Sequence, residues 1–251
     1  MLLEGRVAFL TGAGSGIGRA GALALAREGA VVTVTDLDGA RAQMVAQEIL
    51  AAGGRAEAME LDAADDIAVL AAVDSVAVRG RLDILHSHAG IQVPGRLTEI
   101  DSDGMDLSWR LNVRAHFIAA QAAMPHMQRQ RKGSIIITAS NSGVQYDRGM
   151  IAYCTTKHAV IAMTRQIAVD YAADNIRCNA LCPGFVDTPF NLGFEVQMGG
   201  RKALETHVTQ SIPMGRWASV DEVAASIVYL ASDQSGFMTG HALVVDGGEC
   251  L

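Results

Sequence analysis

The stretch RVAFLTGAGSGIGRAGALALAR, residues 6–27, joins an apolar strand, a glycine-rich turn and an alanine-rich helix without interruption. In this context Gly12 permits a tight turn, Gly16 leaves room for a ligand against the backbone, and Gly18 allows the helix to pack closely on the strand. The start of the helix offers free N–H groups and a positive dipole end to a pyrophosphate. The alternative is a flexible Gly/Ser turn without a ligand. We predict a dinucleotide-binding turn that uses Gly12, Ser15, Gly16, Ile17 and Gly18.

A second predicted strand, VVTVT at 31–35, ends in Asp36, about 20 residues beyond the glycine turn. A carboxylate at this position accepts hydrogen bonds from both hydroxyls of an adenine ribose and repels a 2′-phosphate. The turn carries Ala13 and Ser15, and no arginine or lysine immediately follows Asp36. The pattern favours NAD over NADP. The alternative is an ordinary helix-capping aspartate.

Strands and helices alternate along the rest of the chain. We predict helices at 39–52 and 103–130, and a further helix that follows LDAAD and ends at 79. We predict strands at 55–60, 82–90, 133–140 and 240–248. Such alternation implies right-handed crossovers and a parallel sheet. With 251 residues, half of them hydrophobic, the chain is long enough for one large domain. The predicted class is α/β, with a Rossmann-type doubly wound parallel sheet flanked by helices on both faces in a single domain over 1–251.

The carboxyl ends of parallel strands share one edge of the sheet, and several candidate residues follow these ends. Asp62 follows the third strand and is expected to reach the adenine. Ala89 and Gly90, at the end of the fourth strand, are small enough for the backbone to lie against a ribose. The fifth strand brings Ser140 to the same edge.

Tyr153 and Lys157 are four residues apart on a predicted helix, so the phenol and the ammonium share one face. A cation about 4 Å from the phenol favours its ionised form by ~4 kcal/mol at an effective dielectric constant of about 20. This spacing predicts a tyrosine that exchanges protons near neutral pH. By itself the pattern is common, and the alternative is an exposed aromatic ring beside a solvated lysine.

Charge and hydropathy exclude several classes of protein. The formal net charge is −7 and the isoelectric point is about 5.4, which argues against nucleic-acid or anionic-membrane partners because both need a basic face. The basic run at Arg129, Arg131 and Lys132 is interpreted as a solvated helix end. No apolar stretch reaches 18 residues, and the N-terminus lacks a signal sequence, so we expect a cytoplasmic, soluble protein.

Cysteine and histidine spacing gives no metal site. Cys154, Cys178, Cys182 and Cys250 form no C-x-x-C pair and are expected to be free thiols. The seven histidines include no H-E-x-x-H pattern. His86 and His88 are expected to face opposite sides of their strand, which is poor geometry for joint ligation.

Taken together, the chain resembles the single-domain type of the short-chain dehydrogenase/reductases over essentially all of its length. The resemblance rests on several motifs in the order typical of the family, and their joint occurrence is specific. They are TGAGSGIG at 11–18, SHAG at 87–90, Asn112, Ser140, Tyr153 with Lys157, PGFVDT at 183–188 and GHALVVDGG at 240–248. One departure is that the family's Asn-Asn-Ala-Gly is Ser-His-Ala-Gly here, with His88 at an asparagine position.

The resemblance implies a role for each catalytic residue. Tyr153 acts as general acid in carbonyl reduction and as base in alcohol oxidation, and Ser140 hydrogen-bonds the substrate oxygen. Lys157 lowers the tyrosine's pKa and holds the nicotinamide ribose, while Asn112 positions a water that links Lys157 to solvent. Thr188 binds the nicotinamide carboxamide, helped by the Val186 backbone. The implied cofactor residues also include Pro183 and Gly184, together with Tyr153 and Lys157.

The segment at about 188–213 resembles the substrate lid of this family, and we expect a helical flap hinged on Gly193, Gly199 and Gly200. The expected substrate contacts are Ser140, Ser142, Gln145 and Tyr153. The remaining expected pocket residues are Tyr146, Met150, Phe185 and Phe190. These side chains are mostly neutral, and no arginine or lysine stands out as a carboxylate clamp. A polyol, sugar-derived or simple secondary alcohol is therefore at least as well accommodated as an acid.

Three functions remain open at this point. The first is an NAD-dependent oxidoreductase that interconverts a secondary alcohol and its ketone by hydride transfer. The second is a 3-oxoacyl-thioester reductase, whose relatives usually use NADPH, against which Asp36 argues. The third is a dinucleotide-sensing regulator, a type that typically lacks the tyrosine or the lysine.

We also expect a homotetramer, or a homodimer. Apolar side chains on the helices that contain Asn112 and Lys157 suggest pairing across a twofold axis. These side chains are Phe117, Ile118, Met124, Val160, Met163 and Ile167.

Overall fold

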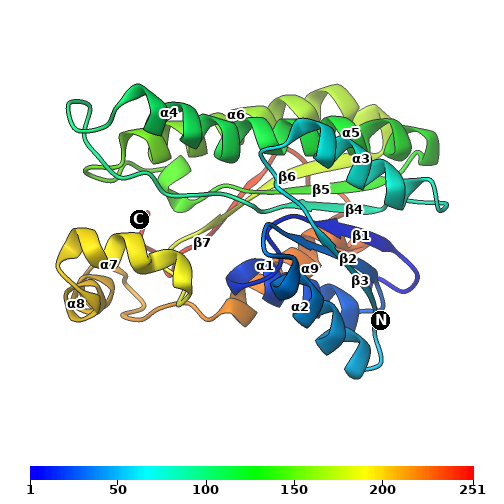
Figure 1. Ribbon diagram of the computed structural model, residues 1–251, viewed down its shortest axis with the longest axis horizontal. Helices are drawn as coiled ribbons and strands as arrows, with labels where there is room; N and C mark the ends of the chain where they lie inside the picture. Colours follow the sequence, from blue (N-terminus) through cyan, green and yellow to red (C-terminus); the bar gives the residue numbers. More distant parts are fainter.

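A seven-stranded parallel sheet forms the centre of the molecule, in the order β3-β2-β1-β4-β5-β6-β7. The computed structural model describes all 251 residues (Figure 1). The strands are β1 (Val7–Leu10), β2 (Val31–Asp36), β3 (Arg55–Glu60), β4 (Ile84–Ser87), β5 (Gly133–Thr138), β6 (Ile176–Pro183) and β7 (Ala242–Val245). The strand order reverses direction between β1 and β4, so the prediction of a doubly wound parallel sheet is confirmed.

Helices cover both faces of this sheet (Figure 1). One layer contains α3 (Asp66–Ala77), α4 (Ser102–Trp109), α5 (Ala115–Gln130) and α6 (Ile151–Tyr171). The other contains α1 (Gly16–Arg27), α2 (Gly39–Ala51) and α9 (Val220–Ala231). Two shorter helices, α7 (Leu192–Met198) and α8 (Arg201–Ser211), lie together at one end of the sheet. No helix is long and apolar enough to cross a membrane.

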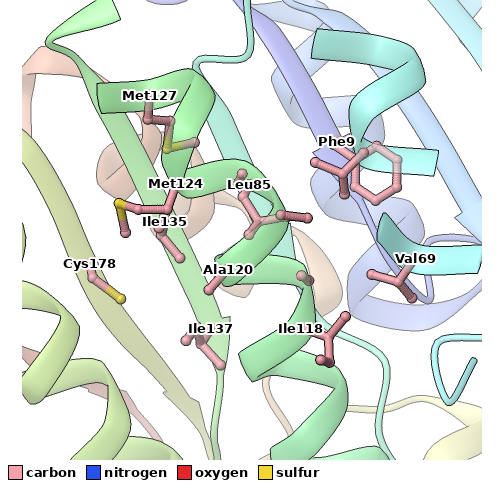
Figure 2. Close-up of a cluster of buried hydrophobic side chains, with 14 of the residues drawn as sticks. Phe9, Val69, Leu85, Ile118, Ala120, Met124, Met127, Ile135, Ile137 and Cys178 are labelled. Carbon is pink, nitrogen blue, oxygen red and sulfur yellow. The ribbon is translucent and has the colours of Figure 1, made fainter. Parts of the chain in front are cut away.

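Alternating side chains along each strand build one core on each face. On β5, Ile135 and Ile137 belong to the cluster under α3, α5 and α6, whereas Ile136 belongs to the cluster under α1, α2 and α9. Figure 2 shows Ile135 and Ile137 beside the helix that carries Ala120 and Met124. Strands covered on both faces bury successive side chains, and the central strands β1 and β5 are accordingly apolar along most of their length, whereas the edge strand β3 is half-buried and contains charged residues.

The helix predicted at 103–130 is interrupted by a π-helical turn, Arg110–Arg114, between α4 and α5. The Ala115 N–H donates to the Arg110 carbonyl five residues back, which widens this turn. Single π turns of this kind occur mostly at functional sites. Here the turn contains Asn112, whose side chain is fully buried.

The segment from Pro189 to Ser211 is helical, as predicted, but only two of the three glycines predicted as hinges separate its helices. Gly193 lies inside α7 and is not a hinge. Gly199 and Gly200 separate α7 from α8 with φ values of +88° and +120°, a backbone region that favours glycine. Leu204, Val208 and Ile212 of α8 and its end pack with partly buried aromatic side chains. These are Phe185, Phe194 and Trp217.

The apolar residues expected to lie on an assembly face are mostly inside the protomer. Ile118, Met124 and Val160 belong to the buried cluster under α5 and α6. Met163 and Ile167 pack against the same cluster. Phe117 remains exposed over about half of its surface, at 49%. The expectation was therefore wrong for Ile118, Met124 and Val160, which the fold buries, whereas Met163 and Ile167 are only partly buried.

Candidate active site

A cavity of about 590 Å³ lies at the carboxyl edge of the sheet, and most of the predicted site residues line it. It is lined from the cofactor side by Gly12, Ser15, Gly16, Ile17, Asp36, Asp62, Ala89, Gly90, Pro183, Gly184, Val186 and Thr188. It is lined from the substrate side by Ser140, Ser142, Tyr146, Met150, Tyr153, Lys157, Phe185 and Phe190. Three predicted residues do not line it: Gly18, Asn112 and Gln145.

The glycine turn requires glycine at two positions for steric reasons. Gly12 has φ +63°, and a Cβ there would lie 2.9 Å from the Ala89 Cα. A Cβ at Gly18 would lie 2.2 Å from the Gly12 carbonyl oxygen and 2.9 Å from His88 Cδ2. Gly18 does not line the cavity, but its lack of a side chain lets α1 approach the turn closely.

The first turn of α1 suits a pyrophosphate. Its first backbone hydrogen bond runs from the Arg19 N–H to the Ser15 carbonyl (3.0 Å), so the N–H groups of Gly16, Ile17 and Gly18 precede the helical ladder. The Ser15 side chain does not cap them, and no acidic residue stands in the first turn. These donors and the positive end of the helix dipole fit a dinucleotide phosphate group.

Asp36 ends β2 at the predicted position, and its carboxylate accepts the N–H groups of Gly14 (2.9 Å) and Asp38 (3.0 Å). The structure adds one cation that the sequence argument missed. A Cβ at Gly14 would lie 2.8 Å from both the Arg41 Cβ and the Asp36 carboxyl group, so Arg41 of α2 lies beside the turn. Its guanidinium is 3.1 Å from Asp38. Arg41 is five residues after Asp36 and lies in the first turn of α2, and this position at the start of the predicted helix was the available signal.

Tyr153 and Lys157 are both buried, with exposed fractions of 5% and 3%. The Lys157 Nζ lies 5.6 Å from the centre of the Tyr153 ring and donates to the Thr138 carbonyl (3.0 Å). Burial raises the pKa of Tyr153, while a hydrogen bond with Ser140 acts in the opposite direction. Burial also lowers the pKa of Lys157 to about 8. The net direction for the tyrosine is opposite to the one expected from the spacing, because desolvation of the phenolate outweighs the hydrogen bond with Ser140.

Asn112 lies behind the cavity and joins two elements. Its Oδ1 accepts the Ile91 N–H (2.8 Å), and its Nδ2 donates to the Ile91 carbonyl (3.0 Å) and to Thr156 Oγ1 (3.2 Å). The asparagine therefore fixes the backbone after β4 to α6 rather than bonding its own helix. It holds Gly90 close to Lys157, since a Cβ at Gly90 would lie 2.9 Å from the Asn112 Oδ1 and 3.5 Å from Lys157 Nζ.

His86 and His88 lie on the same side of β4, so the expectation that they face opposite sides was wrong. Residues two apart on a strand share a face. The two ring centres are 5.3 Å apart, and Thr138 Oγ1 lies 3.0 Å from both His86 Nε2 and His88 Nδ1. A hydroxyl can donate to one ring and accept from the other. Burial, together with the Lys157 charge, lowers the pKa of His88 to about 4, so the ring that replaces the family asparagine is neutral.

The substrate side of the cavity contains polar residues that were not predicted. Asn141, Asp147 and Glu249 line it, as do Arg148 and His207. Gln145, predicted to contact substrate, does not line the cavity; its N–H donates to the Asn141 carbonyl (2.9 Å). Glu249 follows β7 by four residues, at the carboxyl edge that carries the whole site, and this position was the available signal.

Comparisons with known proteins agree with this geometry. A family model described as enoyl-(acyl carrier protein) reductase matches residues 12–249. A 2-keto-3-deoxy-L-fuconate dehydrogenase from Xanthomonas campestris pv. campestris is 39% identical over 98% of this chain and 80% of its own length. The chain belongs to the short-chain dehydrogenase/reductase family. The resemblance inferred from the motifs is thereby confirmed.

Other family members are similar to this chain over nearly its whole length. A 3-oxoacyl-[acyl-carrier-protein] reductase from Thermotoga maritima is 35% identical over 99% of both chains. A putative NAD(P)-dependent gluconate 5-dehydrogenase from Beutenbergia cavernae, solved with bound NADP, is 34% identical with a TM-score of 0.94 over 99% of this chain and 98% of its own. Like these members, this short-chain dehydrogenase/reductase is an NAD(P)-binding oxidoreductase that acts on alcohol and ketone groups.

Proposed function

We propose that the protein is an NAD-dependent oxidoreductase that interconverts a secondary alcohol and its ketone, with Tyr153 as general acid and base. The observation that carries the proposal is the position of Tyr153, Ser140 and Lys157 in the wall of one cavity with the glycine turn. In this arrangement a substrate oxygen held by Ser140 and Tyr153 would share one cavity with a cofactor whose pyrophosphate lies at the start of α1.

In oxidation, the Tyr153 phenolate takes the proton of the substrate hydroxyl as the carbonyl forms. Ser140 donates a hydrogen bond to the substrate oxygen and holds it beside the phenol. Lys157 lies between the Thr138 carbonyl and the tyrosine ring, where its ammonium would hold the nicotinamide ribose. The bound nicotinamide supplies the hydride acceptor, and in reduction the same residues act in reverse.

NAD is the proposed cofactor because of the charge at the end of β2. A carboxylate at the end of this strand, such as Asp36, accepts ribose hydroxyls and repels a 2′-phosphate. Arg41 is the residue that opposes this preference, but it lies 3.1 Å from Asp38, which neutralises part of its charge. One relative was solved with bound NADP, so the preference of this protein for NAD over NADP has to be measured directly.

A 3-oxoacyl-thioester reductase is the second candidate. It is supported by the full-length similarity to the Thermotoga maritima reductase. Asp36 argues against it, since such relatives usually use NADPH. A regulator that binds the cofactor without turnover is disfavoured because both Tyr153 and Lys157 are present.

A panel of secondary alcohols, polyols and hydroxy acids, assayed for reduced cofactor by absorbance with NAD and with NADP, tests the proposal. We expect oxidation of at least one alcohol with NAD at a kcat/KM well above that with NADP. Reduction of an acetoacetyl thioester with NADPH, without any alcohol oxidation, would favour the second candidate. Lys157→Met is expected to lower turnover and to weaken cofactor binding, because its ammonium acts on both the tyrosine and the ribose.

We propose a homotetramer in the cytoplasm, where the NAD pool is available. Four exposed apolar side chains on α4, α5 and α6 support an assembly face, namely Leu107, Trp109, Phe117 and Val169. Light scattering should then give about four times the protomer mass of 26.4 kDa. A clean monomer at micromolar concentration contradicts the assembly, and fractionation of cells tests the location.

A further inference from the structure

One end of the active-site cavity differs from the catalytic end in its charge. Asp147, in the turn before α6, and Glu249, in the C-terminal turn after β7, both line the cavity beyond Ser140. Between them stand two buried polar residues, Asn141 and Ser142. This group of four residues is here called the carboxylate subsite.

Glu249 is held in place by the fold of the C-terminal turn. The Asp246 carboxylate accepts the N–H groups of Gly248 (2.9 Å) and Cys250 (2.9 Å), which closes the turn around Glu249. A Cβ at Gly184 would lie 2.7 Å from the Asp246 Cβ and 3.1 Å from the Glu249 Oε2, so the turn lies tightly against β6's end. Asn141 Nδ2 then donates to Glu249 Oε2 (2.9 Å). The carboxylate therefore has one defined position.

Asp147 faces the same group from the other side. Its Oδ2 accepts the hydroxyl of Ser142, which is itself 3% exposed. Neither Asp147 nor Glu249 takes part in an ion pair. Asp147 also accepts the more distant Cys154 thiol (3.9 Å), and Gln145 acts on Glu249 beside Asn141. Because a carboxylate has about four lone-pair positions, these protein donors leave room for a substrate hydroxyl.

The pKa of Glu249 agrees with this close arrangement. Burial, followed by the charges of Asp147 and Asp246, raises its pKa to about 7, while Asn141 and Gln145 act in the opposite direction. At neutral pH the subsite therefore carries both hydrogen-bond acceptors and a proton that it can donate.

We propose that the carboxylate subsite binds additional hydroxyl groups of a neutral, polyhydroxylated substrate while Ser140 and Tyr153 hold the reacting one. Hydroxyls are both donors and acceptors, and the subsite alternates carboxylates with an amide and a serine hydroxyl. Asp147 and Glu249 would repel a substrate carboxylate, and Arg148, an exposed residue that also lines the cavity, is the neighbouring cation that acts against this repulsion. The inference rests on the proposed alcohol oxidation and specifies its substrate class.

Three alcohols with one four-carbon skeleton test the subsite: 2-butanol, butane-2,3-diol and erythritol, which carry one, two and four hydroxyls. The kcat/KM of the unmodified enzyme should rise with the number of hydroxyls. Glu249→Leu should lower kcat/KM for the diol or the tetrol by ~10-fold or more while 2-butanol changes less than about twofold, since a hydrogen bond to a charged group contributes about 1.5–3 kcal/mol. The kcat/KM of Glu249→Gln, which keeps an acceptor oxygen, should fall between the values of the unmodified enzyme and Glu249→Leu.

Glu48→Leu is the matched control, because Glu48 is exposed on α2 and outside the cavity. Asp147→Asn is the second variant, and thermal melting establishes that each variant is folded. An unchanged ratio between polyol and 2-butanol in both Glu249→Leu and Asp147→Asn would overturn the subsite but leave the proposed function intact. Preferred turnover of 3-hydroxybutyrate, or of 3-amino-2-butanol over the diol, would also overturn it. If no alcohol is oxidised by a Tyr153-dependent reaction, the proposed function falls as well.

Discussion

The first turn of the sheet, residues 11–18 after β1, and the last, residues 246–251 after β7, lie at the same carboxyl edge and line the same cavity. The first turn acts through its backbone, by N–H groups and by the absence of side chains at Gly12 and Gly18. The last turn acts through one side chain, Glu249, which distant contacts hold in place. Only the first turn could be recognised from its own residues.

This difference has a physical origin. Close approach of backbone requires glycine at set spacings, so the requirement leaves a local pattern in the sequence. A carboxylate at a cavity wall requires only that the chain passes nearby, which leaves no local pattern. The position of Glu249 depends instead on Asn141, Gly184 and Asp246. Substitutions in the two turns should therefore fail in different ways.

The largest effect is expected in the first turn. Gly18→Ala places a Cβ 2.2 Å from the Gly12 carbonyl oxygen and forces the turn away from α1. Overpacking of this kind costs about 1–3 kcal/mol, so the affinity for NAD should fall ~10–100-fold. Because the cofactor is common to all reactions, activity should fall alike for every substrate. Gly104→Ala is the control, because Gly104 lies in α4 and its nearest neighbour atoms are 3.1 Å away. Cofactor titration by fluorescence measures both, and equal affinities would show that Gly18 is not constrained.

A smaller effect is expected at the adenosine end of the first turn. Asp36→Ala removes the repulsion of a 2′-phosphate and should reduce the preference for NAD over NADP by about tenfold. Arg41→Ala should change the preference in the opposite direction, because it removes the cation nearest to the turn. The ratio of the two dissociation constants decides the matter. Equal affinity of the unmodified protein for both cofactors would mean that the role given to Asp36 is wrong.

The smallest effect is expected in the last turn, as a pH dependence of stability. Because the folded-state pKa of Glu249 is raised to about 7, the folded protein binds this proton more tightly, and its stability falls as pH rises from about 4.5 to 7. Glu249→Gln removes that loss, so its melting temperature relative to the unmodified protein should rise between pH 5 and pH 8. Solvent screening of this partly exposed group limits the change to about 1 kcal/mol, or about 2–4 °C. A constant difference across this range would contradict the pKa.

The fold was predictable because apolar strands, their alternation with helices and the glycine turn are local signals. Most of the expected cofactor residues lie on the cavity wall for the same reason. The π turn at Asn112, the pairing of His86 with His88 through Thr138, and the approach of Arg41 depend on contacts between elements. The raised pKa of Tyr153 follows from burial, which residue spacing alone does not reveal.

The central claim is that Tyr153 transfers the substrate proton, and Tyr153→Phe tests it most directly because it removes only the phenolic oxygen. Melting temperature and NAD affinity should be nearly unchanged. Oxidation of the best alcohol in the panel should fall by at least ~10²-fold, within the ~10²–10⁴-fold that general acid–base groups contribute. In the intact enzyme the rate should rise with pH, since only the phenolate accepts the proton. A Tyr153→Phe variant that binds NAD normally and keeps most of its activity would contradict the account.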